Sequence, residues 1–180
     1  MIVGLTQRVL THNGQAYDSI DQAWYRYLEG HTLVFVCNRL DQDFQQLAQN
    51  IDCLIITGGD DSALRRTTEL KLATEMLKLQ KPIVGVCHGC FLLQDVLGGT
   101  VVDIDNHHNT SHNIIYQGQE YQVNSYHTIC VKTPHEKATV LAVDADGNTE
   151  AWIDGNIAGV VWHPERMDKP WLPPEIQKLL

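Results

Sequence analysis

The sequence of 180 residues has little positive charge: 13 lysines and arginines stand against 22 aspartates and glutamates, and the formal net charge is −9. Nonspecific binding to nucleic acid needs a basic surface, so this balance argues against a nucleic-acid-binding protein. An anionic small molecule stays open as a substrate, because a pocket can be locally positive on an acidic protein.

Long apolar runs are also missing. No stretch approaches the length of a membrane span, and the apolar run at residues 1–5 is too short, and lacks the basic lead, for a signal peptide. We therefore expect a cytoplasmic protein that does not bind membranes. The five cysteines are odd in number. In a reducing compartment they are expected to be free thiols, of which at most one or two carry chemistry.

The chain shows no internal repeat, low-complexity tract or linker. Its composition, with 43% hydrophobic and 19% charged residues, is ordinary for a globular protein. A chain of this length can bury a sizeable core. We therefore predict one domain over residues 1–180, with no second module.

The first half of the sequence alternates between strand and helix patterns. Strands are predicted at 2–6, 33–37, 53–57 and 83–86, and helices at 18–29, 41–50, 62–79 and 88–97. Such an order implies a parallel sheet that is covered on both faces. The second half reads as strands at 100–104, 113–116, 121–125, 128–132, 139–143, 150–153 and 157–162. Together they predict an α/β three-layer sandwich with a central, mostly parallel sheet and an antiparallel extension.

A glycine-flanked cysteine lies between a buried strand and a helix, in the segment Gly85-Val86-Cys87-His88-Gly89. This G-x-nucleophile-x-G pattern is typical of an elbow, in which glycines relieve crowding around a strained strand-to-helix turn. The helix N-terminus stabilises a thiolate at such a position. The backbone N–H of His88, directly after the cysteine, is placed to meet a developing oxyanion. Cys87 is therefore the candidate nucleophile.

A thiol nucleophile works with a base and a carboxylate that orients the base. The best pair is His163 and Glu165, which flank a stiffening proline at the end of the last apolar strand. Either residue alone would read as a solvated strand end. Together with Cys87 they predict a catalytic triad.

The ordered motifs resemble those of class I glutamine amidotransferases and the related γ-glutamyl hydrolases. Besides the elbow and His163-Pro164-Glu165, they are Thr57-Gly58-Gly59-Asp60-Asp61, Leu97-Gly98-Gly99 and Asn124-Ser125-Tyr126-His127. The resemblance covers essentially the whole chain and implies a flavodoxin-like sandwich. It also implies a hydrolase that acts through a γ-glutamyl thioester. By the same resemblance, Gly59 supplies the second oxyanion N–H, and Asp60, Ser125 and Tyr126 line the substrate pocket.

One position departs from the family pattern. Members that use free glutamine commonly carry a glutamine four residues after the nucleophile, where this chain has Phe91. A phenyl ring makes none of those hydrogen bonds, so we expect Phe91 to face a substrate other than free glutamine. Strings at residues 4–8, 17–18 and 21–24 resemble the stand-alone γ-glutamyl hydrolases, and more narrowly the γ-glutamyl-CDP-amidate hydrolases of capsule phosphoramidate synthesis.

The narrow resemblance predicts cleavage of γ-glutamyl-CDP-amidate to glutamate and cytidine diphosphoramidate, with no metal or organic cofactor. Hydrolysis of γ-glutamyl-aminobutyrate or another γ-glutamyl amine is the next alternative. A glutaminase subunit that feeds ammonia to a synthetase is another, and it alone would need a protein partner. Arg8 and Arg39 are candidates to meet an anionic leaving group, although solvated surface arginines are the default.

Two further patterns suggest other chemistry. Cys87-x-x-Cys90 has the spacing of a thioredoxin-like redox site, but the many strands that follow do not suit that small fold. Several histidines and a cysteine suggest zinc, and His108-x3-His112 would suit two ligands on a helix. The Asn, Thr and Ser around residues 107–112 instead favour a polar, substrate-facing loop. The full candidate set is His107, His108, His112, His127 and Cys130.

Overall fold

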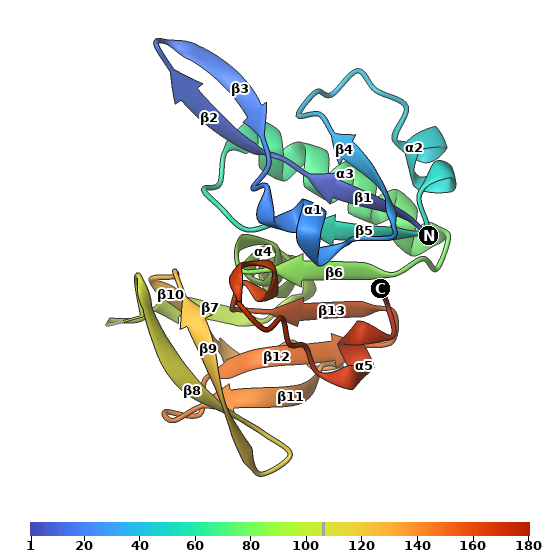
Figure 1. Cartoon of the computed structure of the whole chain (residues 1–180). Coiled ribbons are helices and arrows are strands. Elements are labelled where there is room, and N and C mark those ends of the chain that lie inside the picture. The colour runs from blue at the N-terminus through green and yellow to red at the C-terminus, as the bar shows by residue number, and fades with distance from the viewer. Residues whose placement is uncertain (106) are drawn as a thin grey trace.

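The computed structural model describes residues 1–105 and 107–180. Parallel strands form one half of its large sheet (Figure 1), and they are named below in the order in which they lie side by side. The strands are β4 (Thr32–Val36), β1 (Ile2–Thr6), β5 (Cys53–Ile56), β6 (Ile83–Val86) and β13 (Ile157–Val160). Every residue of β5 and β6 is buried, as expected for parallel strands that are covered on both faces.

Antiparallel strands extend the sheet beyond β13. They are β12 (Thr149–Asp154), β11 (Thr139–Asp144), β8 (Thr110–Tyr116) and β9 (Gln119–Ser125), in that order. A further strand, β10 (Ile129–Thr133), pairs with β12 and with β7 (Thr100–Asp103). The predicted fold class, a parallel sheet with an antiparallel extension, is confirmed.

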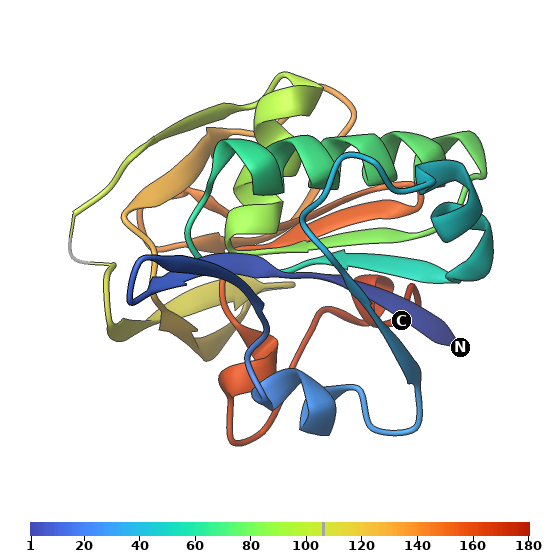
Figure 2. The ribbon, with the colours of Figure 1, turned by 90° about the horizontal axis from the view of Figure 1, so that it is seen from above.

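Helices cover both faces of the sheet (Figure 2). On one face lie α2 (Phe44–Asn50), α3 (Ala63–Lys78) and α4 (His88–Leu97). On the other lie α1 (Ala23–Tyr27), the 3₁₀ helix η1 (Pro164–Arg166) and α5 (Pro174–Gln177). Among the described residues, no helix is long and apolar enough to cross a membrane.

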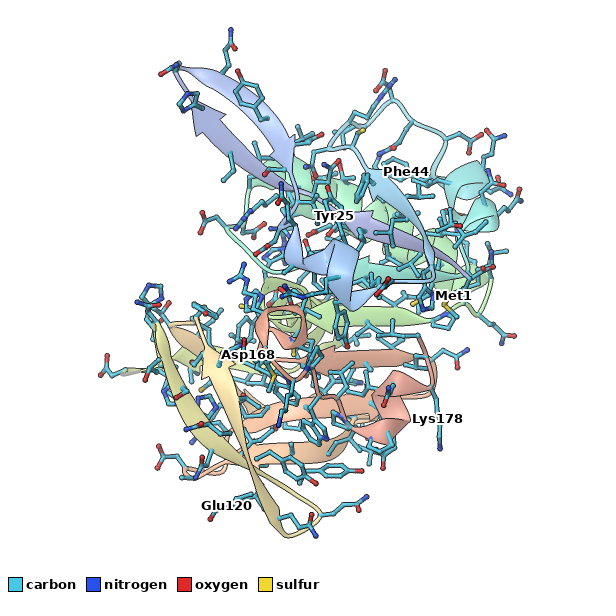
Figure 3. All side chains as sticks on the ribbon, in the orientation of Figure 1. Met1, Tyr25, Phe44, Glu120, Asp168 and Lys178 are labelled. Atoms are coloured by element: carbon cyan, nitrogen blue, oxygen red, sulfur yellow. The ribbon has the colours of Figure 1, made fainter. Side chains whose placement is uncertain are left out.

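The prediction of one helix over residues 18–29 is partly wrong. A hairpin of β2 (Arg8–His12) and β3 (Gln15–Ser19) takes up the start of that range, and only α1 remains helical. The chain reverses at Asn13 and Gly14, both with positive φ, and Asn-Gly is the dipeptide that tight hairpin turns prefer. The hairpin projects away from the sheet, and Figure 3 shows its tip without a neighbouring element.

The predicted polar loop at 107–112 is also partly wrong, because β8 begins at Thr110. His112 therefore lies on a strand, opposite Val123 of β9. The polar residues 110–112 look like a loop in the sequence, but they form a strand because they pair with β9. The helix α5 near the C-terminus is not predicted at all, because its four residues are too few to show a period.

Candidate active site

A pocket of about 670 Å³ opens beside the carboxyl ends of the central strands. Open α/β sheets bind ligands at this edge. Cys87 follows β6, Gly59 follows β5 after two residues, and His163 follows β13 after two residues. All three line the pocket, so sequence segments that are far apart meet at one edge of the sheet.

Cys87 has the strained backbone of a nucleophile elbow. Its φ is 50° and its ψ is −106°, and it is the N-cap residue of α4. Its N–H donates to the carbonyl of Val160 at 2.9 Å, and its own carbonyl accepts from the N–H of Phe91 at 3.1 Å. A positive φ in a residue other than glycine costs energy and clusters at functional sites.

Two glycines make this turn sterically feasible. A Cβ atom added to Gly85 would lie 2.5 Å from the carbonyl oxygen of Gly89. A Cβ atom added to Gly89 would run into the carbonyl oxygen of Ile56. Real Cβ contacts are not this short, so any side chain here would displace α4 from β5 and β6. Both glycines of the G-x-C-x-G motif are therefore required, because only glycine allows α4 to pack this closely against β5 and β6.

The predicted base and carboxylate lie side by side, with His163 at the pocket and Glu165 behind it. The Nδ1 atom of His163 is 2.6 Å from Oε1 of Glu165, and both residues are buried. Asn124 of β9 fixes the backbone of His163 twice. Its amide nitrogen donates to the His163 carbonyl, and its amide oxygen accepts from the His163 N–H, both at 2.8 Å. A Cβ atom on Gly58 would collide with the imidazole, so this glycine makes room for the ring.

The environment of His163 favours its charged form. Burial acts to lower the pKa of His163, but its interactions with the Cys87 and Glu165 side chains raise that pKa to about 9. With Nδ1 donating to Glu165, the Nε2 atom is available to exchange a proton with a reacting group. The three side chains of the predicted triad are thus brought together in a suitable order.

The two predicted oxyanion donors also lie at the pocket. Gly59 and His88 both line it. Among the described residues, neither backbone N–H donates to a backbone or side-chain acceptor. The imidazole of His88 does have a partner, because its Nε2 atom lies 2.8 Å from Oε2 of Glu69.

The predicted substrate-binding residues divide into two groups. Asp60, Phe91 and Tyr126 line the pocket, and the Tyr126 ring meets His163 edge-on at a centroid distance of 5.4 Å. Ser125 is fully buried and lies outside the pocket lining, where its hydroxyl donates to the carbonyl of His107. A direct contact of Ser125 with substrate stays a prediction.

The two arginines named from the sequence have different surroundings. Arg39 is exposed and forms a bidentate ion pair with Asp41 at 2.8 Å, away from the pocket. Arg8, at the base of the β2–β3 hairpin, lines the pocket and packs its side-chain carbons against Gly59. It has no ion pair within the described residues, and its Nε atom is buried without a hydrogen-bond partner.

Three of the histidines proposed for zinc, His107, His112 and His127, form a partly buried cluster. The ring centroids of His107 and His112 are 4.8 Å apart, and those of His107 and His127 are 5.2 Å apart. Burial and the neighbouring histidines lower the pKa of His127 to about 4, so its ring is neutral. Within residues 1–105 and 107–180, no three of the His, Cys, Asp and Glu side chains are arranged to hold a metal ion. His108 lines the pocket, and Cys130 is buried on β10.

Cys90 differs completely from Cys87. It is fully buried, and its sulfur accepts a hydrogen bond from Nε1 of Trp152 at 3.2 Å. Burial raises the pKa of the Cys90 thiol far above its usual range. Both cysteines are free thiols. The C-x-x-C spacing therefore places one sulfur at the pocket and the other in the core, which is unlike a redox pair.

Sequence reasoning assigned no role to three residues that hold the site. One is Asn124, which fixes His163, and the others are Arg65 and Glu69 of α3, both fully buried. A signal for these two was present. Arg65 and Glu69 stand four residues apart on the same face of the predicted helix 62–79 as the buried Leu72 and Met76. Charged residues in an apolar stripe indicate a buried ion pair.

An α/β sheet with a cysteine elbow and a His-Glu pair at its carboxyl edge defines a class of cysteine hydrolase. The chain belongs to the class-I glutamine amidotransferase family, whose family model matches residues 15–176. It is 27% identical to a glutamine-hydrolyzing GMP synthase subunit of Sulfurisphaera tokodaii, over 67% of this chain and 70% of that protein.

Two further proteins are similar to this chain. Protein NtpR of Enterococcus hirae is 31% identical, over 64% of this chain and 67% of NtpR. Among solved structures, a glutamine amidotransferase of Thermotoga maritima aligns with a TM-score of 0.69. That alignment has 16% identity and covers 91% of this chain and 76% of the other. At this identity it shows a shared fold.

The elbow glycines generate a stability prediction. Gly89→Ala should lower the free energy of unfolding by roughly 3 kcal/mol, because the new methyl group meets the Ile56 carbonyl. Gly155→Ala is the control. Its φ is +56° and open space surrounds it, so it should lose only about 1 kcal/mol. Urea denaturation measures both, and equal losses would contradict the steric argument.

The His163 environment generates a pH prediction. The imidazole titrates near 6.5 in the unfolded chain and at about 9 in the fold, so the folded state binds more protons between these values. Its contribution to stability is therefore complete below pH 6.5 and is lost as the pH rises through 9. The stability advantage of the wild type over His163→Gln should shrink over that range in urea titrations. An advantage that grows with pH would contradict the assignment.

Proposed function

We propose that this chain is a cysteine-dependent hydrolase that cleaves a γ-glutamyl amide bond and releases glutamate. The observation that carries the proposal is the strained elbow of Cys87, which lines one pocket together with His163. Glu165 lies directly behind the imidazole. The name of the Sulfurisphaera relative, which describes it as glutamine-hydrolyzing, supports amide hydrolysis as the reaction type.

In the proposed mechanism the Cys87 thiolate attacks the γ-carbonyl carbon, and the electron pair of the C=O bond moves to oxygen. The N–H groups of Gly59 and His88 stabilise this oxyanion. The tetrahedral intermediate collapses, the C–N bond breaks, and His163 gives its Nε2 proton to the leaving nitrogen. A γ-glutamyl thioester and the free amine result.

Water completes the cycle. The His163 imidazole, now neutral, takes a proton from water that attacks the thioester carbonyl. Collapse of this second intermediate expels the Cys87 thiolate and releases glutamate. Glu165 keeps the imidazole in the tautomer that presents Nε2 and stabilises its positive charge in both halves. The short Nδ1–Oε1 distance of 2.6 Å supports that role.

A second candidate function is that of a glutaminase subunit that supplies ammonia to a partner synthetase. The names of relatives, such as GMP synthase and anthranilate synthase component 2, favour it. Phe91 weighs against it. The phenyl ring lines the pocket and lies 5.9 Å from the His127 ring, so this wall offers no side-chain amide to a glutamine substrate.

Within the first function, we infer a substrate with an anionic leaving group, and γ-glutamyl-CDP-amidate is the specific proposal. Three arginines line the pocket, but two are already neutralised. Arg66 pairs with Asp95 at 2.5 Å, and Arg166 pairs with Asp21 at 3.0 Å. Arg8 has no such partner within the described part of the chain. Its position supports a contact with a phosphate, which a guanidinium binds through two parallel hydrogen bonds.

The nucleophile assignment generates a direct prediction. Cys87→Ala should reduce glutamate release from a panel of γ-glutamyl amides to background, because no thioester forms. Cys90→Ala is the matched control. It should keep most of the activity, since that thiol points into the core at Trp152. Circular dichroism verifies that both variants fold. The reverse pattern of activities would refute the triad.

The leaving-group proposal generates a prediction for Arg8. Arg8→Gln should lower kcat/KM for γ-glutamyl-CDP-amidate about tenfold to a hundredfold, the effect of losing a charge-assisted hydrogen bond. For γ-glutamyl-methylamide, whose leaving group is uncharged, the change should stay within about threefold. Arg39→Gln, on the surface, is the control.

Two outcomes would contradict the prediction for Arg8. Equal losses on both substrates would mean that Arg8 acts on the γ-glutamyl part or on Gly59. If the wild type has an equal kcat/KM for γ-glutamyl-methylamide and γ-glutamyl-CDP-amidate, the proposed specific substrate is wrong, and the proposal of a general γ-glutamyl hydrolase remains.

A further inference from the structure

Two fully buried charges, Arg65 and Glu69 of α3, lie behind the pocket. The Nε atom of Arg65 donates to Oε1 of Glu69 at 2.8 Å. Glu69 also accepts from the hydroxyl of Thr6 at 2.7 Å and contacts Nε2 of His88 at 2.8 Å. Burial acts to raise the pKa of Glu69, but His88, Arg65 and Thr6 lower it, so Glu69 is a carboxylate.

The remaining donors of Arg65 hold the loop after β5. Its guanidinium donates to the carbonyl of Thr57 at 2.5 Å, to that of Asp60 at 3.0 Å and, at the longest range, to that of Gly58 at 3.5 Å. An arginine fork has five donors in a fixed plane. One side chain thus fixes several successive peptide units of the loop that carries Gly59.

Because a peptide unit is planar, holding the Gly58 carbonyl also fixes the direction of the Gly59 N–H. The carbonyl of Gly58 and the N–H of Gly59 belong to one trans peptide and point in opposite directions. Because the Gly58 carbonyl faces Arg65, the Gly59 N–H faces the other way, toward the pocket that Gly59 lines. The same rule applies to Cys87, whose carbonyl faces Phe91, so that the His88 N–H points out of α4.

We propose that the Arg65–Glu69 pair positions both oxyanion donors, with Arg65 setting the Gly59 peptide and Glu69 holding His88 at the start of α4. Arg65 and Glu69 are positioning residues, since neither lines the pocket. The inference rests on the proposed function of Gly59 and His88 as oxyanion donors. It explains why a charged pair is kept in the core, where a buried ion pair adds little stability over an apolar replacement.

The fold has other means of holding these elements together. The Thr57 N–H donates to the Thr6 hydroxyl at 3.1 Å, and the Thr57 hydroxyl donates to the Thr6 carbonyl at 2.8 Å. The parallel pairing of β1, β5 and β6 supports the same edge. Conservative changes in the pair are therefore expected to leave a folded protein in which the direction of the amides is less well fixed.

The test separates attack on a carbonyl from attack on a saturated carbon. Acylation of Cys87 by p-nitrophenyl acetate passes through an oxyanion, whereas alkylation by iodoacetamide does not. In Arg65→Lys and Glu69→Gln, the acylation rate should fall about tenfold to a hundredfold. This loss should not exceed the loss that follows removal of one oxyanion donor. The alkylation rate should change by no more than about twofold, because the thiolate is unaltered.

The controls use the same substitutions elsewhere. Glu75→Gln, on the same helix, breaks a surface pair with Lys78, and Arg39→Lys alters the surface pair with Asp41. Neither should change either rate. Peptide-resolved mass spectrometry follows modification of Cys87 separately from the exposed Cys37.

Specific results would overturn the proposal. Unchanged acylation in the folded variants would remove the positioning role, and an equal fall of both rates would mean that the thiolate itself had changed. If Arg65→Lys fails to fold, Glu69→Gln, which preserves the side-chain shape, decides alone. A wild type that hydrolyses no γ-glutamyl amide, yet shows the acylation loss in the variants, would refute the proposed function and leave the positioning role in place.

Discussion

The left-handed backbone of Cys87 is the constraint on which the rest of the site depends. At φ 50° the chain passes from β6 into α4 without an intervening loop, so the thiol stands at the pocket at the N-cap position of α4. This turn leaves no room for side chains at Gly85 or Gly89. The position of α4 against β5 and β6 is therefore set by the turn at Cys87, and the surrounding packing must stabilise a strained residue.

Electrostatics at this site depends on local pairing of charges and not on the net charge of the whole chain. The formal net charge is −9, yet the pocket contains His163 held in its charged form and an arginine, Arg8, without an ion pair within the described residues. Burial makes these charges effective, because fewer water dipoles screen them. Asp60, Asp61 and Asp95 line the same pocket as the arginines, so an anionic group would be attracted to the one arginine that lacks an ion pair among the described residues, and not to the pocket as a whole.

Much of the fold could be predicted, because its signals are local in sequence. Apolar four-residue runs such as those of β5 and β6, and the G-x-C-x-G pattern, can be recognised without knowing which other segments they contact. The β2–β3 hairpin escapes prediction because its two strands are short and mostly exposed, so they lack the alternation of buried and exposed residues that marks a strand, and the Asn13-Gly14 turn alone is a weak signal. Arg65 and Glu69 were missed because their partners, from Thr6 to His88, are distant in sequence and meet only in the folded chain.

Cys87 and Cys90 show why a motif alone does not assign chemistry. They are three residues apart, at the N-cap and in the first turn of one helix, so by spacing either sulfur, or both as a pair, could react. The fold separates them. Cys87 precedes the first turn of α4 and opens to the pocket, whereas Cys90 lies one turn on, against Trp152, where burial raises the pKa of its thiol. A thiol that stays protonated is a poor nucleophile. The two sulfurs therefore differ in whether they lie at the N-terminus of α4, beside the pocket, or one turn further on in the core, and the turn at Cys87 fixes that difference.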